Sequence, residues 1–84
     1  MYYVYLLQSL DNEDKNYIGY TKDLKRRLKE HNKFHKGYTG KEKWRLVYYE
    51  AYLSKNDAVR RENSLKDGRS KYHLLNRVKA SLKK

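Results

Sequence analysis

Residues 2–7, YYVYLL, and residues 17–20, YIGY, decide the fold of this chain of 84 residues. Both runs consist largely of aromatic, β-branched and aliphatic residues and are too short for helices, so each predicts a β-strand. The segment between them, residues 11–16, is polar and rich in turn-forming residues. The two strands are therefore expected to form a hairpin.

The hairpin is followed by residues at helical spacing. Leu24, Leu28 and His31 recur at intervals that place them on one side of a helix, and Thr21 is an acceptable N-cap. This pattern predicts a helix over residues 22–33.

Beyond this helix, the sequence predicts a loop, a strand and a second helix. Residues 35–43 contain two glycines among Lys and Thr and predict an exposed basic loop, whereas residues 45–53, RLVYYEAYL, predict a third strand. Ser54 followed three residues later by Asp57 resembles a capping box, which predicts a helix that continues to about Asp67.

The last part of the chain completes the expected architecture. Gly68 is expected to close the preceding helix in a left-handed conformation, and a final helix is expected from Ser70. Its apolar side would be formed by Leu74, Leu75, Val78 and Leu82. The predicted fold is α+β, in the order β-β-α-β-α-α, with a small three-stranded, mostly antiparallel sheet flanked by helices and a single domain over residues 1–84.

The charge of the chain is unevenly distributed. The sequence has 21 Lys and Arg against 10 Asp and Glu, a net charge of +11. Residues 1–20 carry a net charge of −2, and residues 21–84 carry 20 basic against 7 acidic residues, a net charge of +13. Such a field attracts polyanions. Nucleic acid is favoured over a membrane, because the chain lacks a long helix with a bulky apolar face and a basic one.

Several classes of function are excluded by what the sequence lacks. With no cysteine, thiol catalysis and thiolate zinc sites are ruled out. The sequence has no Gly-rich phosphate loop, no carboxylate cluster for a two-metal site and no Gly-x-Ser-x-Gly turn. The remaining functional residues of the sequence can form a site with a single carboxylate and a single metal ion. With no leader-like N-terminus, we expect a cytoplasmic location and no membrane association.

Glu62 stands out on the helix that follows the third strand. Ala58, Glu62 and Leu65 lie at i, i+4 and i+7, so a carboxylate falls in the stripe that should face the sheet. Burial of an unpaired carboxylate costs several kcal/mol, roughly, so the group must be paired, hydrogen-bonded or bound to a cation. An ion pair with one of the many basic residues and a metal site both satisfy this requirement.

Arg27 and His31 lie at i and i+4 of the first predicted helix and project from the same face. A histidine on an apolar face is most often a packing residue, whereas an arginine one turn away offers a fork for phosphate oxygens. The pair alone is weak support for a functional site.

Together these residues resemble a known family. Tyr3-Val4-Tyr5, followed after the acidic loop by Tyr17-Ile18-Gly19, is similar to the paired signature of the GIY-YIG nucleases. Arg27, His31 and Glu62 fall where that family carries its helix arginine, a His or Tyr, and its metal-binding glutamate. The resemblance covers essentially the whole chain and is closest to the small, stand-alone bacterial members.

The resemblance implies an endonuclease that hydrolyses phosphodiester bonds in nucleic acid with one divalent cation, Mg²⁺ or alternatively Mn²⁺. DNA is favoured over RNA as the substrate. Glu62 would hold the metal, and Arg27 would neutralise charge that develops on the phosphate. Tyr5, Tyr17 or His31 would position or deprotonate the attacking water, and the sequence does not choose among the three.

Two positions depart from the family pattern. Tyr3 replaces the leading Gly of the first motif, and Tyr20 follows the second motif where some members carry Lys. The second departure favours a rival function, a non-catalytic nucleic-acid-binding module that retains the fold. A basic structural protein of a ribonucleoprotein particle is a weaker alternative. The expected nucleic-acid contacts are Arg26, Tyr20, Lys66 and Arg69, and targeting would come from this surface or from an unidentified protein partner.

Overall fold

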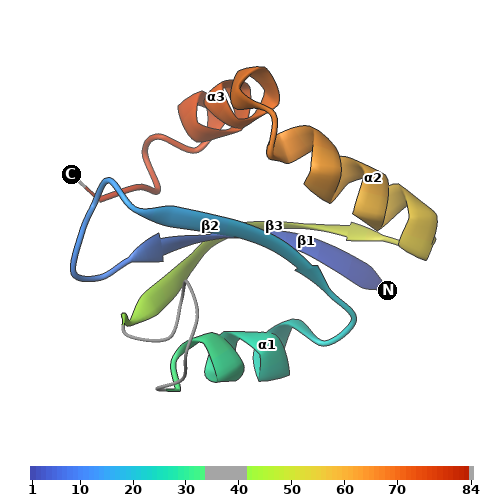
Figure 1. Cartoon of the computed structure of the whole chain (residues 1–84), viewed down its shortest axis with the longest axis horizontal. Helices are drawn as coiled ribbons and strands as arrows, with labels where there is room; N and C mark the ends of the chain where they lie inside the picture. The colour runs from blue at the N-terminus through green and yellow to red at the C-terminus, as the bar shows by residue number, and fades with distance from the viewer. Residues whose placement is uncertain (34–41, 84) are drawn as a thin grey trace.

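The computed structural model of the chain describes residues 1–33 and 42–83 and has the predicted α+β architecture (Figure 1). A three-stranded sheet lies between α1 on one face and α2 with α3 on the other. The order β-β-α-β-α-α is confirmed. The elements are β1 (Tyr2–Ser9), β2 (Asn16–Thr21), α1 (Leu24–His31), β3 (Trp44–Tyr52), α2 (Lys55–Leu65) and α3 (Gly68–Arg77).

The central strand of the sheet is β1, and both of its neighbours run antiparallel to it in the order β2-β1-β3. The predicted hairpin of β1 and β2 is confirmed, and Tyr5 stands directly opposite Gly19. On the other side, Tyr5 stands opposite Tyr49 of β3. This register puts Tyr5 in the middle of the sheet with residues of both outer strands beside it.

Alternation along β1 divides the apolar residues between two thin cores. Val4 and Leu6 point toward α2 and α3, while Tyr5 and Leu7 point toward α1. The first core consists of Val4, Leu6, Ile18, Ala58, Leu65 and Leu74. The second consists of Tyr5, Leu7 and Trp44, with Tyr17, Leu24, Leu28 and Leu46 packed against it.

An irregularity in β3 changes which residues share a face. Pairing with β1 shifts between Leu6 and Leu7, which stand opposite Tyr48 and Leu46 and leave Val47 as the extra residue. Val47 and Tyr48 therefore both pack against the core on the α2 side. Because of this bulge, residues 46 and 49 both lie on the α1 side although they are three positions apart.

Helix α1 is shorter than predicted at both ends. The N-cap is Asp23 and not Thr21, because the Asp23 carboxylate accepts the Arg26 N–H at 3.1 Å while the Thr21 hydroxyl accepts the N–H of Asp23. At the other end, the Asn32 side chain bonds both the N–H and the carbonyl of Trp44, at 2.6 and 3.1 Å. This bond ties the end of α1 to the start of β3.

The junction of α2 and α3 also differs from the prediction. The C-cap of α2, Lys66, has right-handed helical angles of φ −82° and ψ −12°, and the chain turns through the extended Asp67. Gly68 therefore begins α3, and the prediction that it closes α2 in a left-handed conformation is wrong. The cap of α2 is Ser54, as predicted, and it accepts the N–H of Asn56 at 3.2 Å.

A partly buried carboxylate joins β3 to α2. Glu50 accepts a bidentate pair of hydrogen bonds from Arg61, both atoms at 3.0 Å, and further bonds from the hydroxyls of Tyr48 and Tyr52. Burial alone would raise the pKa of Glu50, but the bonds from Arg61, Tyr52 and Tyr48 outweigh it and lower that pKa. This network fixes α2 over the sheet.

Most of the predicted basic loop lies outside the described residues. Among the helices that the structure does describe, none has both the length and the apolar character to cross a membrane.

Candidate active site

The centre of the site is a hydrogen bond between β1 and the last turn of α1. The Tyr5 hydroxyl lies 2.7 Å from Nε2 of His31, and both residues are only 2% exposed. Burial raises the pKa of Tyr5 to about 12, although a hydrogen bond from Arg27 acts in the opposite direction. The phenol is therefore protonated at neutral pH and can donate a hydrogen bond to Nε2 of His31.

Arg27 lies one turn earlier on α1 than His31, and its guanidinium acts on the pKa of Tyr5. Its hydrogen bond to Tyr5, followed by its bond to Glu30 at 3.0 Å, raises the pKa of the guanidinium further above its usual range. Part of its side chain is exposed, at 42%, so this fixed positive charge lies between the buried pair and solvent. An anion that reached the site would meet it first.

Tyr17 completes a cluster of three rings. Its ring centroid lies 4.9 Å from that of His31, 6.3 Å from that of Tyr5 and 6.4 Å from that of Trp44. Tyr5, Tyr17, Arg27 and His31 are thus brought together on the α1 face of the sheet. These are four of the five catalytic residues expected from the sequence.

Gly19 leaves the space that this cluster needs. A Cβ at residue 19 would lie 2.6 Å from the Tyr5 hydroxyl oxygen, 2.8 Å from Tyr5 Cζ and 2.9 Å from Tyr17 Cε2. The Tyr5 side chain therefore crosses the edge strand β2 at the one residue without a side chain. Its hydroxyl is carried from the central strand toward the edge of the sheet, a role for Gly19 that the sequence analysis missed.

Glu62 approaches the site from the opposite layer. It lies on α2, its side chain is 15% exposed, and its carboxylate forms an ion pair with Lys66 at 3.3 Å. Its negative charge contributes to the raised pKa of Tyr5, after burial and the charge of Tyr17. Lys66 and Tyr17 line a common cavity of about 260 Å³ at the β2 edge. The end of α2 and the ring cluster therefore meet across this edge strand.

The donor set around Glu62 suits a hard cation that keeps much of its water. Within the described part of the chain, no three His, Cys, Asp or Glu side chains converge so as to share a metal ion. Mg²⁺ commonly binds through one or two carboxylates plus waters and substrate phosphate oxygens. A single, mostly buried carboxylate fits that ion and does not fit a zinc site with three or four protein ligands.

The four residues expected to contact nucleic acid are spread over both faces. Arg26 is exposed at the start of α1, whereas Lys66 and Arg69 are exposed at the junction of α2 and α3. Tyr20 packs against the core on the α2 side, so it does not share a face with Tyr5.

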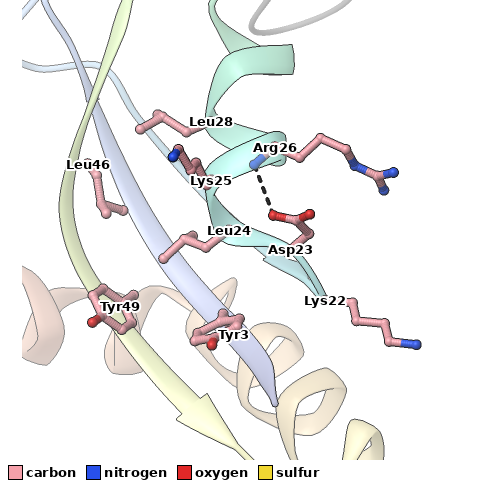
Figure 2. A pocket seen from close by; sticks show the side chains of 9 residues that line it. All are labelled: Tyr3, Lys22, Asp23, Leu24, Lys25, Arg26, Leu28, Leu46 and Tyr49. Carbon is pink, nitrogen blue, oxygen red and sulfur yellow. Dashed lines mark hydrogen bonds between the residues drawn. The ribbon is translucent and has the colours of Figure 1, made fainter.

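A groove beside the ring cluster was not foreseen (Figure 2). It has a volume of about 750 Å³ and lies between α1 and strands β1 and β3. Leu24, Leu28 and Leu46 form its apolar part, and Tyr3 and Tyr49 lie together at one end. The bulge in β3, which turns Tyr49 to this face, has no clear signal in the sequence.

Comparison with known proteins shows the family to which the chain belongs. The sequence model of the GIY-YIG catalytic domain matches residues 1–77, and the chain belongs to this family of nucleases, whose substrate is nucleic acid. A UPF0213 protein of Haloquadratum walsbyi is 36% identical over 70 residues, which cover 77% of this chain and 73% of that protein. The solution NMR structure of a UPF0213 protein from Bacillus halodurans superposes with a TM-score of 0.55 at 36% identity, over 90% of this chain and 84% of that one.

Proposed function

We propose that this protein is a divalent-metal-dependent endonuclease that hydrolyses phosphodiester bonds, in DNA rather than in RNA. The observation that carries the proposal is the buried hydrogen bond between Tyr5 and His31, with the positive charge of Arg27 one helical turn away. A buried tyrosine held by both a proton acceptor and a fixed cation is an arrangement for moving a proton beside an anion. A tyrosine that served only to pack the core would not need a proton acceptor and a cation beside its hydroxyl.

Tyr5 and His31 act as a pair. With a pKa of about 12, the Tyr5 phenol is too weak an acid to be present as a free base at neutral pH. It can take a proton from the attacking water only as its own proton passes to Nε2 of His31, at 2.7 Å. Tyr17, whose ring packs on that of His31, holds the imidazole in place for this transfer.

Arg27 and Glu62 handle the phosphate. The Arg27 guanidinium neutralises negative charge that develops on the phosphoryl oxygens as the water attacks. Glu62 is the residue that would hold Mg²⁺, or Mn²⁺ in its place. The cation, when bound, would polarise the scissile phosphate and stabilise the leaving oxygen. For this role the ion pair between Lys66 and Glu62 must open. The pair is weak because the Lys66 side chain is exposed.

Exposed bases would bind the rest of the substrate. Arg26, Lys66 and Arg69 carry charge on both sides of the candidate site, and such contacts position a phosphate backbone without reading sequence. Tyr20 would contribute only from the α2 side. A cytoplasmic location and a targeting partner remain part of the proposal.

One observation favours the rival function. The Glu62 carboxylate is ion-paired to Lys66, as expected of a non-catalytic nucleic-acid-binding module that keeps the fold. Such a module would bind tightly, with a steep salt dependence, and would cut nothing.

A cleavage panel separates the two functions. Supercoiled DNA, branched DNA and RNA are incubated with the protein in Mg²⁺ and in EDTA, beside Arg27→Ala and the matched control Arg60→Ala. Arg60 is exposed on α2, and its partner is Asp57 at 3.5 Å. We expect Mg²⁺-dependent cutting that is lost in Arg27→Ala, kept in Arg60→Ala and strongest on DNA, with binding kept by both variants. Binding without cleavage of any substrate would establish the rival function.

A further inference from the structure

The groove between α1 and strands β1 and β3 lies beside the candidate active site on the same face of the sheet. Tyr3 is two residues before Tyr5 on β1, a separation of about 7 Å along a strand, and Tyr49 stands directly opposite Tyr5. On α1, the lining residues Lys25 and Arg26 immediately precede Arg27. A chain of nucleotides with one phosphate at Arg27 therefore has its neighbouring nucleotide at this groove.

The end of the groove is an aromatic platform. The rings of Tyr3 and Tyr49 meet edge to face, with centroids 5.9 Å apart and planes at 66°. In such a pair, the ring that presents its edge keeps both faces uncovered by its partner. Tyr49 is 52% exposed, so aromatic surface at this site remains open to a ligand.

The charges around the groove favour an anionic ligand. Lys22, Lys25 and Arg26 surround the start of α1, and Figure 2 shows Lys22 and Arg26 extending from its outer side. Asp23, the one carboxylate among the described lining residues, accepts the N–H of Arg26 as the helix cap. An apolar ligand without charge would make no use of these bases.

We propose that this groove binds an unstacked nucleobase of the substrate, next to the scissile phosphate, with its ring against Tyr49 and its backbone phosphate at Lys25. Bases inside a duplex stack on one another and offer only their edges, so an aromatic ring in a groove can cover only a base that has left the stack. The volume of about 750 Å³ lies in the usual range for a small-molecule site, about 300–1,000 Å³. The preferred substrate is accordingly single-stranded or locally unpaired nucleic acid.

Tyr3 links this inference to the sequence. It occupies the position where the first motif departs from the family's leading glycine, and its ring forms half of the aromatic platform. The inference rests on the proposed function, which places the scissile phosphate at Arg27. Its test therefore measures binding without metal, where no cutting occurs.

The experiment compares a fluorescein-labelled single strand with its blunt-ended duplex by fluorescence anisotropy in EDTA. Tyr49→Ala is expected to weaken single-strand binding by roughly 5- to 150-fold, the range for loss of one stacked base, and to leave duplex binding unchanged. Tyr49→Phe should restore single-strand binding, whereas Tyr49→Leu, which keeps the bulk of the side chain on β3, should not. The matched control is Tyr72→Ala, an exposed tyrosine on α3.

Two results would overturn the inference. One is single-strand binding by Tyr49→Ala or Tyr49→Leu that equals the wild type. The other is an equal loss on single strand and duplex. In either case, cleavage that depends on Arg27 and Glu62 would still support the proposed nuclease function. A preference for single strands that depends on Tyr49, without any cleavage, would support the base-binding groove and refute the nuclease function.

Discussion

Gly19 offers the sharpest test of how the site is built, because the space it leaves is known in detail. A methyl group at residue 19 would lie 2.6 Å from the Tyr5 hydroxyl oxygen, whereas ordinary contacts of a Cβ lie at 3.4–4 Å. The Tyr5 hydroxyl would have to move by about 0.8 Å, the difference between 3.4 and 2.6 Å. Tyr5 is 2% exposed and bonded to His31, so the ring has little room to move.

The expected cost of Gly19→Ala follows from this clash. Insertion of a methyl group into a packed site costs about 1–3 kcal/mol of unfolding free energy. Misplacement of a catalytic group by about 1 Å can cost on the order of 100-fold in rate. We therefore expect both effects, the first in urea unfolding followed by circular dichroism and the second in nicking of supercoiled DNA under conditions where the variant is folded.

Gly68→Ala is the matched control. A Cβ at Gly68 would have no atom within 4 Å, and the residue begins α3 without a left-handed conformation. This variant should be as stable as the wild type or slightly more stable, by at most about 1 kcal/mol, and fully active. If Gly19→Ala matched the wild type in stability and in rate, the explanation of Tyr5 crossing β2 at a glycine would be refuted.

Three further predictions concern single side chains. Tyr5→Phe removes the hydroxyl at 2.7 Å from His31 and should lower the cleavage rate by about 100- to 10,000-fold. The unfolding free energy should fall by about 1–2 kcal/mol. A larger loss in substrate binding than in cleavage rate would contradict the proton-transfer role of Tyr5. Because the pKa of Glu50 is lowered in the folded protein, its contribution to stability is present above the usual carboxyl pKa of about 4.3 and is lost as the pH falls through the folded value. The unfolding free energy of Glu50→Gln should therefore fall less steeply with decreasing pH than that of the wild type. An unchanged pH dependence would contradict the network around Glu50. Lys66→Met frees the Glu62 carboxylate and should lower the Mg²⁺ concentration for half-maximal cleavage by up to about fivefold, whereas no change would show that this pair does not compete with the cation.

The order of elements could be predicted because it depends on patterns that are local in the sequence. The YYVYLL and YIGY runs are short and apolar and flank a polar loop, so a hairpin was the natural arrangement. The stripe of Ala58 and Leu65 likewise faces the sheet, and both are at most 1% exposed. Glu62, one turn away, is largely buried as the same periodicity predicts.

The helix ends could not be predicted in the same way. Thr21 and Asp23 are both competent caps, and only the geometry decides that the Asp23 carboxylate reaches the N–H of Arg26. At Gly68 the glycine signal was misleading, because the chain turns one residue earlier, through an extended Asp67.

The shape of the site depends on contacts between distant residues. That Tyr5 lies over Gly19 follows from strand register, and that Tyr49 shares a face with Leu46 follows from a bulge in β3. A bulge inserts one residue and reverses the alternation beyond it, and nothing in the run RLVYYEAYL shows where this happens. The groove could therefore not be predicted from the sequence.

We propose that Glu62, on the α2 side of the sheet, is the ligand of a catalytic cation that serves the ring cluster on the α1 side. The most direct test is the single-turnover rate of cleavage in Mg²⁺ for the wild type, for Glu62→Gln, and for Glu13→Gln, an exposed carboxylate in the hairpin loop. We expect Glu62→Gln to lose on the order of 100-fold or more in rate, while its DNA binding in EDTA and the activity of Glu13→Gln are unchanged. Cleavage by Glu62→Gln at the wild-type rate would contradict it.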